Sequence, residues 1–182
     1  IQVIHEGKQV ICLPGATLDS LEQLLKGYDR EPHSVIGSSC IGASVLGGVC
    51  NNSGGALVRR GPAYTELALY AQVNAQGQLE LVNHLGVNLG STPEEILTRL
   101  EQQRYQATDI LDDAEKQASD QRYAQDVTQV DADSPARFNA DPSRLFEASG
   151  SAGKVCVFAV RLDTYEKVES RVFYIGTNDD TR

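Results

Sequence analysis

Residues 30–66 form a segment that is rich in glycine, serine, alanine and asparagine and almost free of charge. It reads REPHSVIGSSCIGASVLGGVCNNSGGALVRRGPAYTE. Because small side chains leave the backbone accessible, its N–H groups and hydroxyls can donate hydrogen bonds to anionic oxygens. The cluster at residues 51–55 suits turns, and interleaved apolar residues would anchor the segment to a core. The sequence therefore predicts a buried loop that contacts a ligand, with a phosphate-bearing cofactor as the natural candidate.

The familiar phosphate-binding glycine motifs do not fit this segment. A Walker A loop needs Lys and then Ser or Thr directly after its last glycine, whereas Gly47 is followed by Gly48, Val49 and Cys50. The dinucleotide fingerprint G-x-G-x-x-G is absent too. ATP or GTP hydrolysis therefore has no support in the sequence.

Three blocks of the sequence resemble one known family. Residues 30–66 resemble the second flavin-contacting segment of the bacterial quinone-dependent D-lactate dehydrogenases, which belong to the PCMH-type FAD-binding family typified by vanillyl-alcohol oxidase. Residues 134–166, SPARFNADPSRLFEASGSAGKVCVFAVRLDTYE, are similar to the end of the same FAD-binding domain. Residues 82–97, VNHLGVNLGSTPEEIL, also fit, so the resemblance covers nearly the whole chain.

The resemblance implies the fold and the domain boundaries. It implies an α+β fold, with a mostly antiparallel sheet flanked by helices, that is the second half of a PCMH-type FAD-binding domain. Residues 1–166 would be the C-terminal part of that domain, with a polar excursion at 101–133, and residues 167–182 would begin the substrate or cap domain. The 182 residues begin at Ile1 and contain no Met, so we expect an internal fragment that is inactive alone and lacks the domain's other glycine-rich loop.

The resemblance also implies an activity and a cofactor site. D-lactate would be oxidised to pyruvate by hydride transfer to FAD, with electrons passing on to quinone, at the cytoplasmic face of the inner membrane. The peripheral membrane-contacting region is expected outside this chain. Motif positions imply FAD contacts at Gly37, Ser44, Gly54 and Val157, with Ser38, Gly42, Ala43 and Asn52 as neighbours.

Alternative functions stay open on the sequence alone. The chain could belong to another FAD-dependent 2-hydroxyacid dehydrogenase of the glycolate type, or to a non-enzymatic nucleotide-binding module. Cys40 could be a thiol nucleophile with His33 as its base, although apolar neighbours raise a thiol pKa. We assign no catalytic residue, and we expect Arg59 and Arg60 at the surface and Tyr64 packed.

Charge and ligand spacing narrow the function further. The formal net charge of −9 disfavours binding to nucleic acid or anionic lipid, and no apolar stretch approaches the ~20 residues that span a bilayer. Four cysteines and three histidines show no metal-ligand spacing. The acids Asp109, Asp112, Asp113 and Glu115 lack EF-hand spacing, so we interpret them as a solvated face rather than a cation site.

Apolar and turn patterns place two hairpins and two further strands. Residues 2–5 and 9–13 flank Glu6-Gly7-Lys8, and residues 67–74 and 79–82 flank the turn 75–78. Further strands are predicted at 154–162 and at 171–176.

Capping signals place two helices. Thr17 begins one, with an apolar stripe of leucines and Gly27 placed to end it. Ser91 or Thr92 begins the other, with Pro93 in its first turn.

Overall fold

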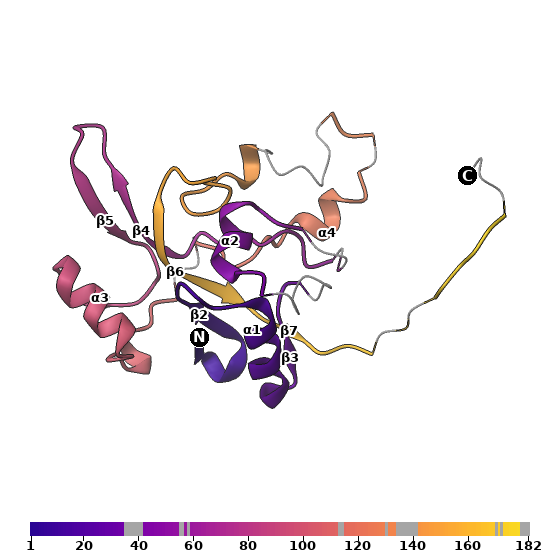
Figure 1. Ribbon diagram of the computed structural model, residues 1–182, viewed down its shortest axis with the longest axis horizontal. Coiled ribbons are helices and arrows are strands. Elements are labelled where there is room, and N and C mark those ends of the chain that lie inside the picture. Colours follow the sequence, from indigo (N-terminus) through magenta and orange to yellow (C-terminus); the bar gives the residue numbers. More distant parts are fainter. Residues whose placement is uncertain are drawn as a thin grey trace.

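The molecule is built on a five-stranded antiparallel sheet, seen in the computed structural model in Figure 1. The structure describes residues 1–34, 42–54, 57, 59–112, 115–129, 131–133, 142–169, 171 and 173–178. Across the sheet the order is β1 (Gln2–Ile4), β2 (Gln9–Cys12), β6 (Cys156–Asp163), β4 (Ala68–Val73) and β5 (Leu79–Asn83). A separate antiparallel pair joins β3 (Arg30–Glu31) to β7 (Tyr165–Glu166). The predicted α+β class with a mostly antiparallel sheet is confirmed.

Alternation along the strands sends side chains to two cores on opposite faces of the sheet. Val10 and Cys12 of β2 join the first core, whereas Ile11 between them joins the second. The first core includes α1 (Leu18–Leu25) and α2 (Val45–Cys50), and the second includes α3 (Pro93–Glu101). The sheet is therefore covered by helices on both faces.

The predicted helix starts are confirmed. Thr17 caps α1 by accepting a hydrogen bond from Ser20 N at 3.1 Å, and Thr92 caps α3 by accepting one from Glu95 N at 3.3 Å. The predicted end of α1 at Gly27 is confirmed, since the helix ends at Leu25 with Lys26 as its C-cap, and the 3₁₀ turn η2 (Lys26–Tyr28) follows it. The left-handed residue that ends this turn is Asp29, with φ 55°.

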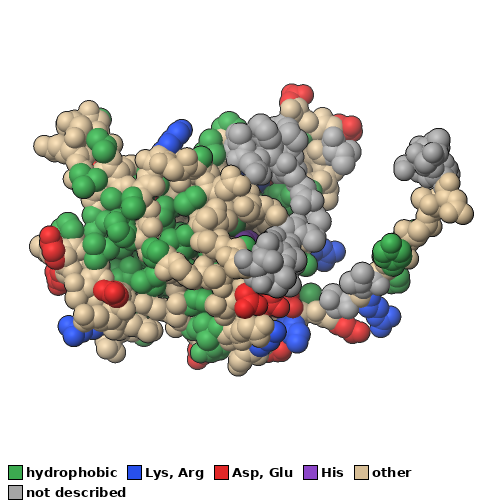
Figure 2. Space-filling view, viewed as in Figure 1, with side chains coloured by type: hydrophobic (Ala, Val, Ile, Leu, Met, Phe, Trp, Pro, Cys, Tyr) green, Lys and Arg blue, Asp and Glu red, His purple; other side chains and the backbone are tan. Residues whose placement is uncertain are grey.

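Both predicted hairpins are present. β1 pairs with β2 around the 3₁₀ turn η1 (His5–Gly7), and β4 pairs with β5 around residues 74–78. The predicted strand at residues 154–162 is β6, which pairs with both β2 and β4. In Figure 2 apolar side chains gather on the side where the β4–β5 hairpin and α3 lie, and the hairpin exposes Val73 and Leu79.

The region 101–133 has little regular structure, as expected, yet it is not simply solvated. Its described part contains the short elements η4 (Ala107–Asp109) and α4 (Tyr123–Asp126). Glu66 and Gln117 exchange two hydrogen bonds, of 2.7 Å to the Gln117 carbonyl and 2.9 Å to the Glu66 carboxylate. Ala118 and Tyr123 are buried, so this region packs on the domain.

The predicted strand at residues 171–176 is wrong. Of the described residues there, none lies in a strand, and Phe173, Tyr174 and Ile175 are 79%, 98% and 88% exposed. Figure 1 shows the chain beyond β7 extending away from the sheet, so its apolar residues meet no neighbouring strand with which to pair. Within the described residues, no helix is both long and apolar enough to span a membrane.

Candidate functional site

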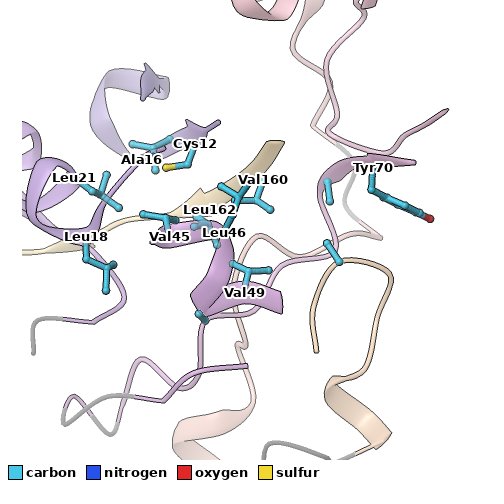
Figure 3. Packing of buried hydrophobic residues seen from close by; sticks show 14 of the residues in the cluster. Cys12, Ala16, Leu18, Leu21, Val45, Leu46, Val49, Tyr70, Val160 and Leu162 are labelled. Carbon is cyan, nitrogen blue, oxygen red and sulfur yellow. The ribbon is translucent and has the colours of Figure 1, made fainter. Parts of the chain in front are cut away.

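The glycine-rich segment is held over the sheet by α2. Figure 3 shows Val45, Leu46 and Val49 of α2 close to Val160 and Leu162 of β6, and all five belong to the first core. The small residue Gly47 lies on the exposed side of the helix. This packing fixes the residues that precede and follow α2 relative to the sheet.

The chain before α2 is tied to the start of α1. Ser44 and Thr17 form an antiparallel bridge, in which Leu18 N donates to Ala43 O at 2.8 Å and Val45 N donates to Ala16 O at 3.0 Å. Ser44 also caps α2, because its hydroxyl accepts from Gly47 N at 3.2 Å. The Ser44 side chain is nevertheless exposed, and its own hydroxyl hydrogen can point to a ligand.

Gly42 leaves the backbone open before the N-terminal end of α2. Its φ is 86°, in the left-handed region that glycine adopts without strain. Apart from its neighbours in the chain, no described residue has an atom within 4 Å of a Cβ built at Gly42.

The chain after α2 turns sharply at Asn52. This residue is buried with φ 44°, a conformation that asparagine tolerates better than most residues. Its Nδ2 donates to Arg144 O at 2.8 Å, while Ser53 N donates to Gly48 O at 2.9 Å. Gly54, two residues further on, is exposed.

A loop between η5 (Pro142–Arg144) and β6 closes over this end of α2. Gly150 N and Ala152 N donate to the carbonyls of Val49 and Cys50, both at 3.0 Å. A Cβ at Gly150 would approach Asn52 Nδ2 to 2.6 Å, so glycine is required for this contact. The loop then enters β6, where Val157 is half-buried against the first core.

Buried polar side-chain atoms without partners are found on this loop and at Asn52, which Gly150 approaches. Among the described residues there are four such side-chain atoms: Ser34 Oγ, Asn52 Oδ1, Glu147 Oε2 and Ser151 Oγ. A buried acceptor or hydroxyl without a partner is destabilising by about 1–3 kcal/mol. The open backbone at Gly42 and the unpartnered atoms of Asn52 and Ser151 suit a ligand with both anionic oxygens and hydroxyl or amine donors.

The six predicted site residues that the structure describes lie in three places. Gly42, Ala43 and Ser44 precede α2, Asn52 and Gly54 follow it, and Val157 lies on β6. Because α2 has six residues, the two groups lie roughly 9 Å apart along its axis. Gly37 and Ser38, like Cys40, lie outside the described residues. The structure thus gathers Ala43 and Val157 around one core, but it does not merge the six positions into a single cluster.

Arg60 anchors the entrance to the glycine-rich segment. Against expectation it is buried, at 8% exposure, because its guanidinium donates to Pro32 O at 2.7 Å, pairs with Glu31 and lies over the Tyr165 ring at 5.0 Å. Burial, then the positive charge of Arg60, lowers the pKa of His33 to about 4. This part of the chain therefore holds a fixed cation beside a neutral imidazole.

Arg59 and Tyr64 match their expected environments. Arg59 is exposed, and Tyr64 is packed with its hydroxyl donating to Glu66 at 2.8 Å. Burial of the Tyr64 ring is the main reason why the pKa of its hydroxyl is raised. Neither residue gains a catalytic role from these contacts.

The acids and cysteines form no metal site in the part of the chain that the structure describes. No group of three or more His, Cys, Asp or Glu side chains there is placed to hold an ion. Asp109 accepts from Gln106 N at 2.8 Å, and Asp112 pairs with buried Arg161 at 3.1 Å. Burial raises the pKa of the Cys12 thiol to about 12.

Three residues of the site were missed by sequence reasoning: His84, Glu147 and Ser151. His84 Nδ1 lies 2.6 Å from Glu147 Oε1, although 63 positions separate the two residues. No local motif joins positions so far apart. The one available hint for Ser151 was its place in the glycine- and serine-rich stretch 149–153.

Comparison with known proteins gives one consistent name. No family model matches the chain. The chain is 66% identical over 179 residues to a quinone-dependent D-lactate dehydrogenase of Haemophilus influenzae, 59% over 179 residues to one of Escherichia coli, and 48% over 180 residues to one of Corynebacterium glutamicum. Each match covers 98% of this chain but 32%, 31% and 31% of the respective relative. The chain therefore spans about a third of the length of the curated relatives it matches.

Proposed function

We propose that this chain is the FAD-binding portion of a longer quinone-dependent D-lactate dehydrogenase. The observation that carries the proposal is 66% identity over 98% of the chain to a relative of that name. The described residues fit an FAD site in one further respect. Open backbone at Gly42 and the unpartnered polar atoms of Asn52 and Ser151 supply both kinds of contact that a flavin dinucleotide needs.

In this proposal the chain's residues bind and orient the cofactor. Gly42 leaves room for the close approach of a phosphate, and the exposed Ser44 hydroxyl donates a hydrogen bond beside it. Asn52 Oδ1 accepts from a ligand hydroxyl or amine, and exposed Gly54 admits the ligand without a side chain in the way. Val157 contributes the backbone of β6. Gly37 and Ser38, outside the described residues, stay predicted FAD contacts on the resemblance alone.

The proposed reaction oxidises D-lactate to pyruvate. Two electrons and two protons leave the substrate. Reduction of quinone to quinol takes up the two electrons and two protons. Bound FAD supplies the centre that accepts a hydride from the substrate C2. Residues that remove the hydroxyl proton and pair with the substrate carboxylate are expected in the part of the enzyme that this chain does not cover. The proposal also places the full-length enzyme peripherally at the cytoplasmic face of the inner membrane.

The test uses the full-length enzyme and three substrates. We expect purified enzyme to release FAD on denaturation, identified by chromatography, and to reduce a soluble quinone analogue with D-lactate much faster than with L-lactate or glycolate. A preference for glycolate would assign the protein to a different 2-hydroxyacid dehydrogenase. Release of no flavin, together with no quinone reduction by any of the three substrates, would favour a non-enzymatic nucleotide-binding module.

A further inference from the structure

A histidine–carboxylate pair joins two distant segments beside the proposed FAD site. His84 directly follows β5, and its Nδ1 lies 2.6 Å from Glu147 Oε1. Glu147 lies in a tight turn in which the backbones of Phe146 and Ser149 exchange hydrogen bonds of 3.1 and 2.8 Å. The turn is thereby attached to the end of the β4–β5 hairpin by a contact between two side chains.

Tyr70 connects this pair to the strand that carries Val157. The rings of Tyr70 and His84 meet edge to face, with centroids 6.4 Å apart, and Tyr70 is opposite Val157 in the pairing of β4 with β6. Burial, then the negative charge of Glu147, raises the pKa of Tyr70 to about 12. The turn, the hairpin and β6 therefore meet in one small polar cluster beside the first core, in which Tyr70 is buried and His84 is partly exposed.

From Glu147 the chain runs directly to the C-terminal end of α2. Gly150 and Ala152 donate their backbone hydrogen bonds to Val49 and Cys50, and Gly150 lies against the Asn52 amide. Glu147 itself has φ 50°, a left-handed conformation that is unfavourable for a residue with a side chain. The hydrogen bond to His84 offsets that strain, because release of the carboxylate would let the turn relax away from α2.

We infer that Glu147, held by His84, is a positioning residue for the proposed FAD site. It fixes the loop 146–153 against α2 and so places Asn52 and Ser151 toward the ligand. This role rests on the proposed function, and it requires no contact between Glu147 and the cofactor.

The test measures FAD affinity by titration of flavin-free, full-length enzyme. Glu147→Ala and His84→Ala are each expected to weaken FAD binding roughly tenfold, since each removes one hydrogen bond to a charged group. The double variant should lose about as much affinity as Glu147→Ala alone, because Glu147→Ala already removes the interaction that His84→Ala removes. Glu147→Gln keeps a hydrogen-bond acceptor at position 147, and His84→Asn keeps a donor at position 84. Both variants should therefore retain most of the FAD affinity.

A second measurement tests how firmly the loop 146–153 is held against α2 in the absence of FAD. In flavin-free enzyme, hydrogen exchange at the amides of Gly150 and Ala152 should be faster in Glu147→Ala than in the unmodified protein. His5→Ala is the matched control, because it removes the other His–carboxylate pair of the described residues, His5 with Asp112 at 3.4 Å. His5→Ala should leave the FAD affinity and the exchange rates of the two amides near those of the unmodified protein.

The outcomes separate the inference from the proposed function. If the unmodified enzyme fails to bind FAD, the proposed function fails. If the unmodified enzyme binds FAD and Glu147→Ala behaves like His5→Ala in both measurements, the positioning role is overturned. An equal loss of affinity in Glu147→Gln and Glu147→Ala would also overturn it, because the amide retains the acceptor for His84. Should Glu147→Ala not fold, His84→Ala and the two conservative variants give the same comparison.

Discussion

Thr17 and Ser44 face each other across an antiparallel bridge, and each caps the helix that follows it. The start of α1 and the start of α2 are therefore fixed to one another by backbone hydrogen bonds on both sides of the bridge. Since Gly42 and Ala43 immediately precede Ser44, the position of the glycine-rich segment depends on α1. An ordinary amphipathic helix thus contributes to the geometry of the proposed cofactor site.

The two caps allow stability and cofactor binding to be separated. We expect Thr17→Ala and Ser44→Ala each to lower the free energy of unfolding by about 1 kcal/mol, the usual effect of losing an N-cap hydroxyl. Only Ser44→Ala should also weaken FAD binding, because Ser44 is exposed at the proposed site. Chemical denaturation and FAD titration measure the two effects. Equal FAD affinities in the two variants would remove Ser44 from the site.

Local sequence signals were sufficient for the hairpins and for the caps of α1 and α3. They were not sufficient for α2, whose interior Gly47 and Gly48 disfavour helix. That helix exists because Val45 and Val49 pack on β6, a contact between distant parts of the chain. Partners distant in the sequence explain the other failures as well. Arg60 is buried because Glu31 and Pro32 satisfy it, and the strand expected at 171–176 has no partner.

Gly150 and Gly77 test how much the closure of the loop on α2 matters. Both have positive φ, 66° and 76°, but a Cβ at Gly150 meets Asn52 Nδ2 at 2.6 Å while one at Gly77 meets nothing within 4 Å. Gly77→Ala should cost about 1 kcal/mol of stability from backbone strain alone. Gly150→Ala should cost roughly 2–3 kcal/mol and also weaken FAD binding, because the added methyl displaces Asn52. Denaturation midpoints and flavin titration of both variants measure this difference, and identical behaviour would contradict the contact.

The cysteines should differ in reactivity by their burial. Cys156 is exposed at the start of β6, whereas Cys12 is buried and burial raises its pKa to about 12. Since the thiolate is the reactive species, iodoacetamide near neutral pH should modify Cys156 and leave Cys12 unmodified in the native protein. Peptide mass spectrometry after timed labelling measures this order. Labelling of Cys12 as fast in the native protein as in a denatured control would contradict the prediction, because it would show that the core around α1 opens.

His33 should make the protein less stable in mild acid. Its pKa in the folded protein is lowered from 6.5 to about 4, by burial and then by the charge of Arg60. As the pH falls below 6.5 the unfolded chain takes up a proton that the folded chain does not, so stability is lost down to about pH 4 and no further below it. Between pH 7 and pH 4.5 this single group should account for roughly 2–3 kcal/mol. His33→Gln removes the titration, so its free energy of unfolding should fall less over that range than that of the unmodified protein.

His5→Gln serves as the control, because His5 is more exposed. Parallel pH profiles for the unmodified protein and His33→Gln would show that His33 is solvated rather than buried beside Arg60.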